Sequence, residues 1–133
     1  MSLSTGRAAF AKALLEGVTF EMRLNLARLA QAGVAVRELR AIGGAAKSKT
    51  WLQLKADIFG VPVTSLDVSE AGSLGTAMLA GWATGVYGDL QEAVAGCVKT
   101  GVTYKPDAAR AAAYTDVFGR YSRLYEAVKS VYA

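Results

Sequence analysis

AIGGAAKSKTWLQLKADIFG, residues 41–60, places two adjacent glycines between a short apolar run and a segment with helical spacing. A glycine pair leaves backbone uncovered, which favours close approach by another group. Two familiar phosphate motifs do not fit. A P-loop needs glycine directly before its lysine, whereas Ala46 precedes Lys47. The dinucleotide fingerprint separates its first glycines, whereas Gly43 and Gly44 are adjacent. A tight turn that binds nothing is therefore the simpler alternative at this stage.

Length, composition and charge exclude several classes of protein. A chain of 133 residues is one ordinary domain, and we expect a single domain over residues 1–133 with a tag-derived start at residues 1–3. Hydrophobic residues make up 53% and charged residues 20%, which argues against disorder. The net charge of +4 is scattered, so we expect no nucleic-acid partner. The absence of histidine removes Ser-His and Cys-His catalysis and the usual zinc sites.

The expected location is the cytoplasm, without a membrane partner. The single cysteine, Cys97, cannot form an internal disulfide, and its small apolar neighbours predict a buried structural thiol in a reducing compartment. Residues 1–10 lack the apolar core of a signal peptide. Residues 71–88 carry no charge, but five of them are glycine, and a membrane span needs about 20 strongly apolar residues. We predict a tightly packed interior helix there instead.

Apolar spacing predicts alternating helices and strands. The first helix carries apolar residues at helical spacing and ends at Gly33: Leu15, Val18, Met22, Leu26 and Leu29. Short strands are predicted at residues 39–42 and 61–68, on either side of a helix closed by Gly60. Two further helices follow, from Ala71 and over residues 90–98. This order is typical of an α/β fold with helices covering a parallel sheet, although two firm strands leave that sheet incomplete.

The C-terminal part predicts a short extended piece followed by a long helix. Residues 101–105, GVTYK, form the extended piece, and Asp107 is placed to cap the helix. The helix carries apolar and aromatic residues spaced for one buried face: Tyr114, Val117, Phe118, Tyr121, Leu124, Tyr125 and Val128. We interpret this face as core packing rather than as a ligand platform.

Four stretches together carry a family resemblance. Residues 39–63, LRAIGGAAKSKTWLQLKADIFGVPV, resemble the G-G-[GA]-x-[KR]-S-x-x-W-x-Q-x-x-A-D-[IV]-x-G-x-P-V pattern of FGGY carbohydrate kinases. Residues 69–94, from SEAGSLGTA onwards, resemble the E-A-x-[AS]-L-G-x-A block that follows in that family. Residues 7–26 and 104–128 resemble the family's preceding helix and its terminal tyrosine-rich helix. The order is the family's, although family chains are several times longer and alanine replaces the third glycine.

The resemblance implies a fold and a site. The fold is α/β, the C-terminal half of an actin-like ATPase (ribonuclease H-like) lobe, with helices packed on a short parallel sheet in a fragment of a larger two-lobe kinase. Gly43, Gly44 and Ala45 would form the turn against the adenosine and inner phosphate of ATP, and Ser48 would approach the adenine. Physical chemistry agrees, because an open turn can donate its N–H groups and the following helix N-terminus is electropositive. Lys47 would add charge near phosphate, with a solvated surface lysine as the alternative.

The resemblance further implies transfer of the ATP γ-phosphoryl group, with Mg²⁺, to a hydroxyl of a sugar or polyol, and the A-K-S-x-x-W turn favours pentulose-like substrates. In the family the catalytic aspartate, the sugar pocket and the first phosphate loop precede this region. We therefore assign no catalytic or metal-binding residue here and interpret Asp57 as structural. We expect Mg²⁺ to be bound mainly by the missing lobe, and we expect the fragment alone to be inactive. Two alternatives stay open: a stand-alone actin-like nucleotide-binding or regulatory module, and a non-catalytic interaction domain.

The resemblance also implies an unfinished sheet. Each actin-like lobe has five strands, of which three precede the first large helix, so only the last two are expected here. The missing neighbour leaves an open strand edge and uncovered helix faces, and such an edge is a template for another chain. We therefore expect a homo-oligomer.

Overall fold

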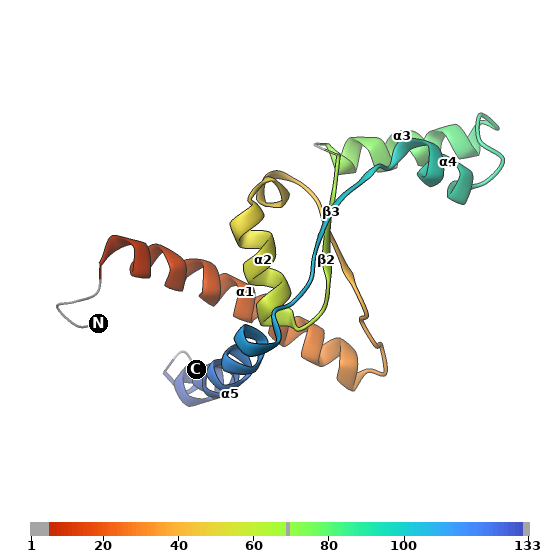
Figure 1. Ribbon diagram of the computed structural model, residues 1–133. Coiled ribbons are helices and arrows are strands. Elements are labelled where there is room, and N and C mark those ends of the chain that lie inside the picture. Colours follow the sequence, from red (N-terminus) through yellow and green to blue (C-terminus); the bar gives the residue numbers. More distant parts are fainter. Residues whose placement is uncertain (1–5, 69, 132–133) are drawn as a thin grey trace.

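The computed structural model describes residues 6–68 and 70–131, apart from the side chain of Tyr125. The elements follow the predicted alternation: α1 (Arg7–Gln31), β1 (Leu39–Ala41), the 3₁₀ helix η1 (Gly44–Lys47), α2 (Lys49–Phe59), β2 (Val63–Leu66), α3 (Ala71–Ala83), α4 (Leu90–Cys97), β3 (Thr100–Tyr104) and α5 (Ala108–Lys129). Figure 1 shows α1, α2 and α5 beside the sheet, with α3 and α4 projecting from one end of it. The expected tag-derived residues 1–3 lie outside the described residues.

The sheet has three strands in the order β1-β2-β3. β1 and β2 pair in parallel, as the sequence predicts, and the structure places Leu39 opposite Val63. The prediction of a purely parallel sheet is wrong for β3, which pairs antiparallel to β2 with Tyr104 opposite Val63. The reason is visible in Figure 1: α3 leaves from the carboxyl end of β2, and α4 returns to the same end. A strand that starts where its neighbour stopped must run back along it.

The core lies where α2 packs on β1 and β2. Leu52 and Ala56 of α2 and Val63 of β2 are buried together, and Leu39 and Phe59 pack against them. Ser48 caps the start of α2, since its Oγ accepts the N–H of Trp51 at 3.3 Å. Gly60 ends the helix in the left-handed region, at φ 70°, which glycine adopts without strain. The helix predicted to end at Gly60 is therefore confirmed.

Aromatic packing joins α1 to α5. The ring of Phe20 lies 6.1 Å from that of Tyr114, 6.1 Å from that of Phe118 and 5.2 Å from that of Tyr121, measured between centroids. These contacts confirm that α5 uses its aromatic face for packing. The predicted face is narrower than expected, because Val117 and Leu124 are exposed.

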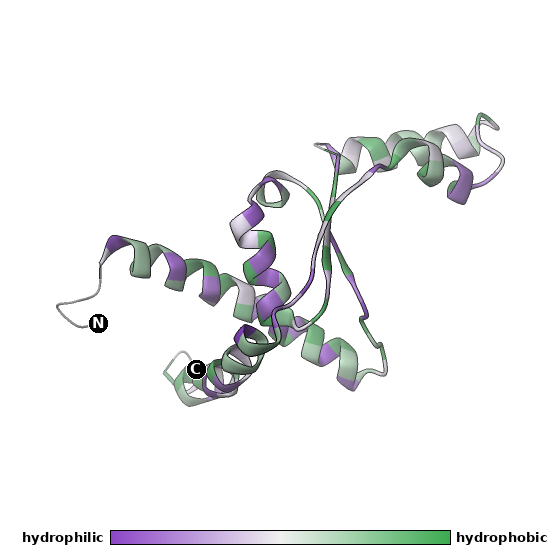
Figure 2. Cartoon of the chain, in the orientation of Figure 1, coloured by the Kyte–Doolittle hydropathy of each residue, from purple (hydrophilic) through white to green (hydrophobic). Residues whose placement is uncertain are grey.

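One long face of α1 has no cover. Thr19 and Phe20 are its buried residues, and the opposite face exposes an apolar row that we call the α1 stripe: Phe10, Leu14, Val18, Met22 and Leu29. The predicted apolar spacing is present, but Val18, Met22 and Leu29 face outwards. Figure 2 shows hydrophobic residues recurring along this helix where no other element packs on it. Helical spacing of apolar residues predicts that one face of a helix is buried, but it does not specify which polypeptide buries that face.

The interior helix predicted over residues 71–88 is wrong for this chain. α3 ends at Ala83 and contains no buried residue. It packs against α4, whose Ala93 is fully buried, and the two project away from the sheet (Figure 1). Cys97 is half-buried rather than buried, with its Sγ 3.6 Å from the Tyr87 hydroxyl. Among the described residues, no helix combines the length and apolar character needed to cross a membrane.

A buried carboxylate fastens α5 to α2. Asp57 accepts hydrogen bonds from the Gln53 side-chain amide at 2.9 Å, the Asp107 N–H at 2.8 Å and Arg110 Nε at 2.7 Å. Burial opposes ionisation of Asp57, but these hydrogen bonds together outweigh it and hold the pKa of the carboxyl below its usual value. Asp107 also caps α5 as predicted, accepting the Arg110 N–H at 2.9 Å. The structural interpretation of Asp57 is confirmed.

Asp57→Asn should lower the free energy of unfolding by about 2 kcal/mol, since an amide group presents a donor where three donors converge. Urea denaturation measures this, with the exposed Asp116→Asn on α5 as a control that should change stability by less than about 0.5 kcal/mol. Because the folded pKa of Asp57 is depressed, its stabilisation is complete above the unfolded value of about 3.9 and is lost as the pH falls through the folded value. The difference between parent and Asp57→Asn should therefore shrink below about pH 4, and a difference that stays constant down to pH 2 would contradict the assignment.

Candidate functional site

The turn after β1 depends on Gly43. Its backbone lies at φ 76° and ψ −168°, a conformation essentially restricted to glycine. The Gly43 carbonyl then accepts the N–H of Ala46 at 3.0 Å, which starts η1. Gly44 has an ordinary φ and is exposed, and a Cβ placed on it would meet no atom within 4 Å. Gly43 therefore shapes the turn, whereas Gly44 leaves open space beside it.

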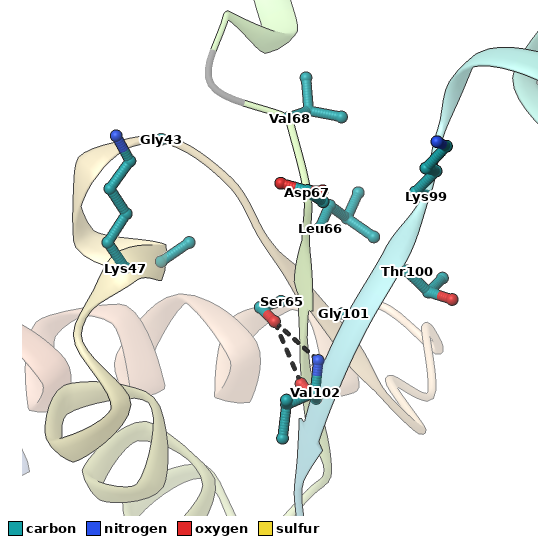
Figure 3. Close-up of a pocket in the computed structure, with 11 residues that line it drawn as sticks. Gly43, Lys47, Ser65, Leu66, Asp67, Val68, Lys99, Thr100, Gly101 and Val102 are labelled. Carbon is teal, nitrogen blue, oxygen red and sulfur yellow. Dashed lines mark hydrogen bonds between the residues drawn. The ribbon is translucent and has the colours of Figure 1, made fainter.

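Parallel pairing brings this turn to the end of β2. The carboxyl ends of parallel strands meet at one edge of a sheet, where α/β proteins commonly bind ligands. A cavity of about 590 Å³ lies there, between the Gly43–Lys47 turn, residues 65–68 at the end of β2 and residues 99–102 at the start of β3. We call it the turn pocket, and Figure 3 shows its side chains. Its volume lies within the range of small-molecule sites.

The structure places the four predicted site residues differently from one another. Gly43 lines the turn pocket, while Gly44 and Ala45 lie beside it at the start of η1. Ser48 stands at the far end of η1, outside the lining, and its Oγ is the cap of α2. Gly43, Gly44 and Ala45 therefore lie together in one turn, whereas Ser48 does not border the same cavity.

Sequence reasoning missed the opposite wall of the turn pocket. Lys47 lies on the turn side and Lys99 on the β3 side, with Asp67 between them (Figure 3). The Asp67 N–H donates to the Lys99 carbonyl at 2.9 Å, so the two backbones are joined. Among the described residues, none of these three side chains forms an ion pair within 4 Å. The missing signal was the direction of β3, since only an antiparallel β3 starts at this edge.

The charges of the turn pocket suit an anion better than a metal ion. Two lysines and one aspartate are its ionisable side chains, which leaves one net positive charge. Within the described part of the chain, no group of three or more His, Cys, Asp or Glu side chains lies together as a metal site would require. The pocket can therefore hold a polar, negatively charged ligand between two cations.

A second cavity, of about 670 Å³, lies between α1, α2 and α5. Its apolar lining includes Leu15 and Leu54. The charged groups at its rim are already paired: Lys12 lies 2.8 Å from Glu16, and Arg110 lies 2.7 Å from Asp57. We therefore take the turn pocket as the functional site.

Comparisons with known proteins agree with the family and the fold. The model of the FGGY family of carbohydrate kinases, C-terminal domain, matches residues 1–84. The xylulose kinase of Bacillus subtilis (strain 168) is 32% identical over 94% of this chain, and the glycerol kinase of Dechloromonas aromatica (strain RCB) is 41% identical over 71% of it. The crystal structure of xylulose kinase from Rhodospirillum rubrum superposes on 98% of this chain with a TM-score of 0.86 and 30% identity.

The same comparisons show what fraction of each relative's length this chain covers. It covers 25% of the Bacillus xylulose kinase, 19% of the Dechloromonas glycerol kinase and 27% of the Rhodospirillum structure. The chain thus spans about a quarter of the xylulose kinases it matches. The predicted actin-like C-terminal lobe fragment is confirmed, with a mixed rather than parallel sheet. The family match covers more than half of the residues, and the chain therefore belongs to the FGGY family of carbohydrate kinases, as part of its C-terminal domain.

Proposed function

We propose that this chain is the nucleotide-binding C-terminal portion of an ATP-dependent carbohydrate kinase. The observation that carries the proposal is the Gly43–Lys47 turn, which borders a pocket of suitable size at the carboxyl ends of two parallel strands in a chain of this family. Gly43, Gly44 and Ala45 offer uncovered backbone to the adenosine and the inner phosphate. The exposed hydroxyl of Ser48 lies one helical turn further on, where it can still donate while its oxygen caps α2.

The open space beside the turn fits a nucleotide. Side chains built on Gly43 or Gly44 would meet nothing within 4 Å, so this chain does not itself fill the place where ATP would lie. The described residues do not fit Mg²⁺, because Asp67 is the only carboxylate lining the turn pocket. We assign the metal to polypeptide beyond this segment. What this chain's residues do in the proposed kinase is to bind and orient ATP, whose γ-phosphoryl group moves to a sugar or polyol hydroxyl.

The proposed acceptor is a pentulose-like sugar or polyol. The A-K-S-x-x-W form of the turn supports this choice, and relatives named xylulose kinase match nearly the whole chain. The same segment is also shared with a glycerol kinase, which is consistent with acceptor contacts outside it. The single half-buried thiol of Cys97 fits the proposed cytoplasmic location.

Gly44→Val should weaken ATP binding about tenfold without unfolding the chain. The added side chain enters space that is empty within the chain but is occupied by nucleotide in the proposal. NMR titration of the isotopically labelled chain with ATP measures the change, because it detects millimolar affinities. Gly43→Ala is the matched control: its strained φ should cost roughly 1–3 kcal/mol of stability, which Gly44→Val should not. Unchanged ATP binding by Gly44→Val would show that the turn is only structural.

The isolated chain should not phosphorylate a sugar. It offers one surface of a two-lobed site, so it should bind ATP weakly and lack the acceptor pocket. ADP release from ATP, measured with and without xylulose, should equal the buffer rate in both cases. Sugar-dependent ADP release that Gly44→Val abolishes would overturn this expectation, since a contaminating kinase would not respond to that substitution.

We also propose that the chain self-associates through β1 and the α1 stripe. β1 lies at one edge of the sheet, and a small cavity of about 200 Å³ remains between Met22 and Leu26 of α1, Leu39 of β1 and Phe59 of α2. In an antiparallel pair of β1 strands centred on Leu39, Glu38 of one copy lies opposite Arg40 of the other, which is a favourable pairing. The two α1 stripes then lie on the same face and can cover each other.

Light scattering at tens of micromolar should therefore report a dimer or a larger oligomer. Val18→Glu, in the α1 stripe, should shift the chain towards monomer, because a carboxylate would be buried in the apolar interface. Ala112→Glu, at an exposed site on α5, should leave the mass unchanged. A parent chain that is monomeric at every concentration contradicts the proposal.

Measurement of ATP binding distinguishes two alternative functions of this chain. A stand-alone nucleotide-binding or regulatory module would bind ATP without the remainder of a kinase, and an interaction domain would bind none. The turn pocket favours nucleotide binding over a pure interaction role, since its two lysines are unpaired among the described residues.

A further inference from the structure

The wall of the turn pocket formed by β3 lies beyond the part of the chain that the family model matches, which ends at residue 84. We propose that Lys99, at the start of this wall, binds the phosphate chain of a nucleoside polyphosphate, facing Lys47 across the pocket. The inference rests on the proposed nucleotide binding and adds a second, opposite wall to the glycine turn.

An irregularity in the sheet fixes the position of this wall. The pairing of β2 with β3 shifts register between Thr64 and Leu66. At the shift, Ser65 Oγ accepts the Val102 N–H at 3.0 Å and donates to the Val102 carbonyl at 3.3 Å. Figure 3 shows both hydrogen bonds at the base of the pocket. β-Bulges of this kind re-aim a strand and its side chains and are frequent next to functional sites.

Gly101 lets the two strands approach closely at the same point. A Cβ on Gly101 would lie 2.5 Å from Ser65 Oγ and 3.2 Å from the Ser65 carbonyl, so a larger residue would push β3 away. The Lys99 carbonyl is held by the Asp67 N–H at 2.9 Å. The Lys99 backbone is therefore held in place, while its side chain is exposed and borders the pocket (Figure 3).

The charged side chains of the turn pocket indicate which class of ligand it binds. Lys47 and Lys99 lie on opposite walls of the pocket, and neither is neutralised by an ion pair among the described residues. An anion between them gains from both charges, and a phosphate chain offers several acceptor oxygens. The Asp67 carboxylate between them repels a bare anion but accepts hydrogen bonds from hydroxyl groups, such as those of a ribose. A nucleoside polyphosphate satisfies all three side chains, whereas inorganic polyphosphate satisfies only the lysines.

NMR titration of the labelled chain with ATP, adenosine and inorganic tripolyphosphate tests the proposal. Lys99→Met should weaken ATP binding about tenfold and leave adenosine binding unchanged, since the lost contact is to phosphate alone. Lys99→Arg, which keeps the charge, should restore most of the affinity. Lys105→Met is the matched control, because Lys105 is exposed just beyond β3 and outside the lining of the pocket. Tripolyphosphate should bind more weakly than ATP.

The results distinguish a failure of the proposed Lys99 role from a failure of the proposed nucleotide binding. If Gly44→Val weakens ATP binding and Lys99→Met does not, the Lys99 role is wrong and nucleotide binding at the turn stands. Equal loss of ATP and adenosine binding in Lys99→Met would also overturn it, because that pattern indicates a structural role. Equal affinities for tripolyphosphate and ATP would overturn the nucleoside assignment. If millimolar ATP shifts no resonance of the turn pocket, both proposals fail.

Discussion

The parallel pairing of β1 with β2, with α2 as the crossover between them, is the constraint on which the rest of this structure depends. It fixes Leu39 opposite Val63 and buries Leu52 and Ala56 against the sheet. It also brings the carboxyl ends of both strands to one edge, where the glycine turn leaves β1. A site at this edge therefore follows from how the strands pair and needs no special local sequence beyond the turn itself.

The buried residues are concentrated in α2 and in the strand β2 on which it packs. α2 carries the core, and its carboxylate Asp57 ties it to α5 through the Arg110 side chain and the Asp107 backbone. In contrast, the α1 stripe is exposed, and α3, which packs against α4, contains no buried residue. Apolar surface of this extent normally faces another polypeptide. The fold is thus tightly packed around α2, whereas apolar residues at its periphery are exposed.

The turn pocket combines a rigid frame with free charges. Its backbone is held by the Gly43 conformation on one side and by the Ser65–Val102 hydrogen bonds on the other. The lysines that border it are exposed, and they pair with no carboxylate among the described residues. Such an arrangement suits a site that accepts and releases a charged ligand, because the ligand does not have to displace an internal ion pair.

The sequence by itself determined the elements whose signals are local. Helical spacing and the φ > 0 residue Gly60 defined α2, Asp107 capped α5, and the glycine pair marked an open turn, because each depends on residues within a few positions of one another. The resemblance of four ordered stretches identified the family and the fold.

Only the tertiary structure decided which faces are covered and which strand ends meet. The uncharged, glycine-rich composition of residues 71–88 predicted a tightly packed interior helix, but α3 packs on α4 and has no buried residue, since composition does not specify a partner. The direction of β3 was set by α3 and α4 returning to the end of β2 that they left. That reversal places Lys99 across from Lys47, residues 52 positions apart in the chain, and no local sequence signal encodes such a long-range contact.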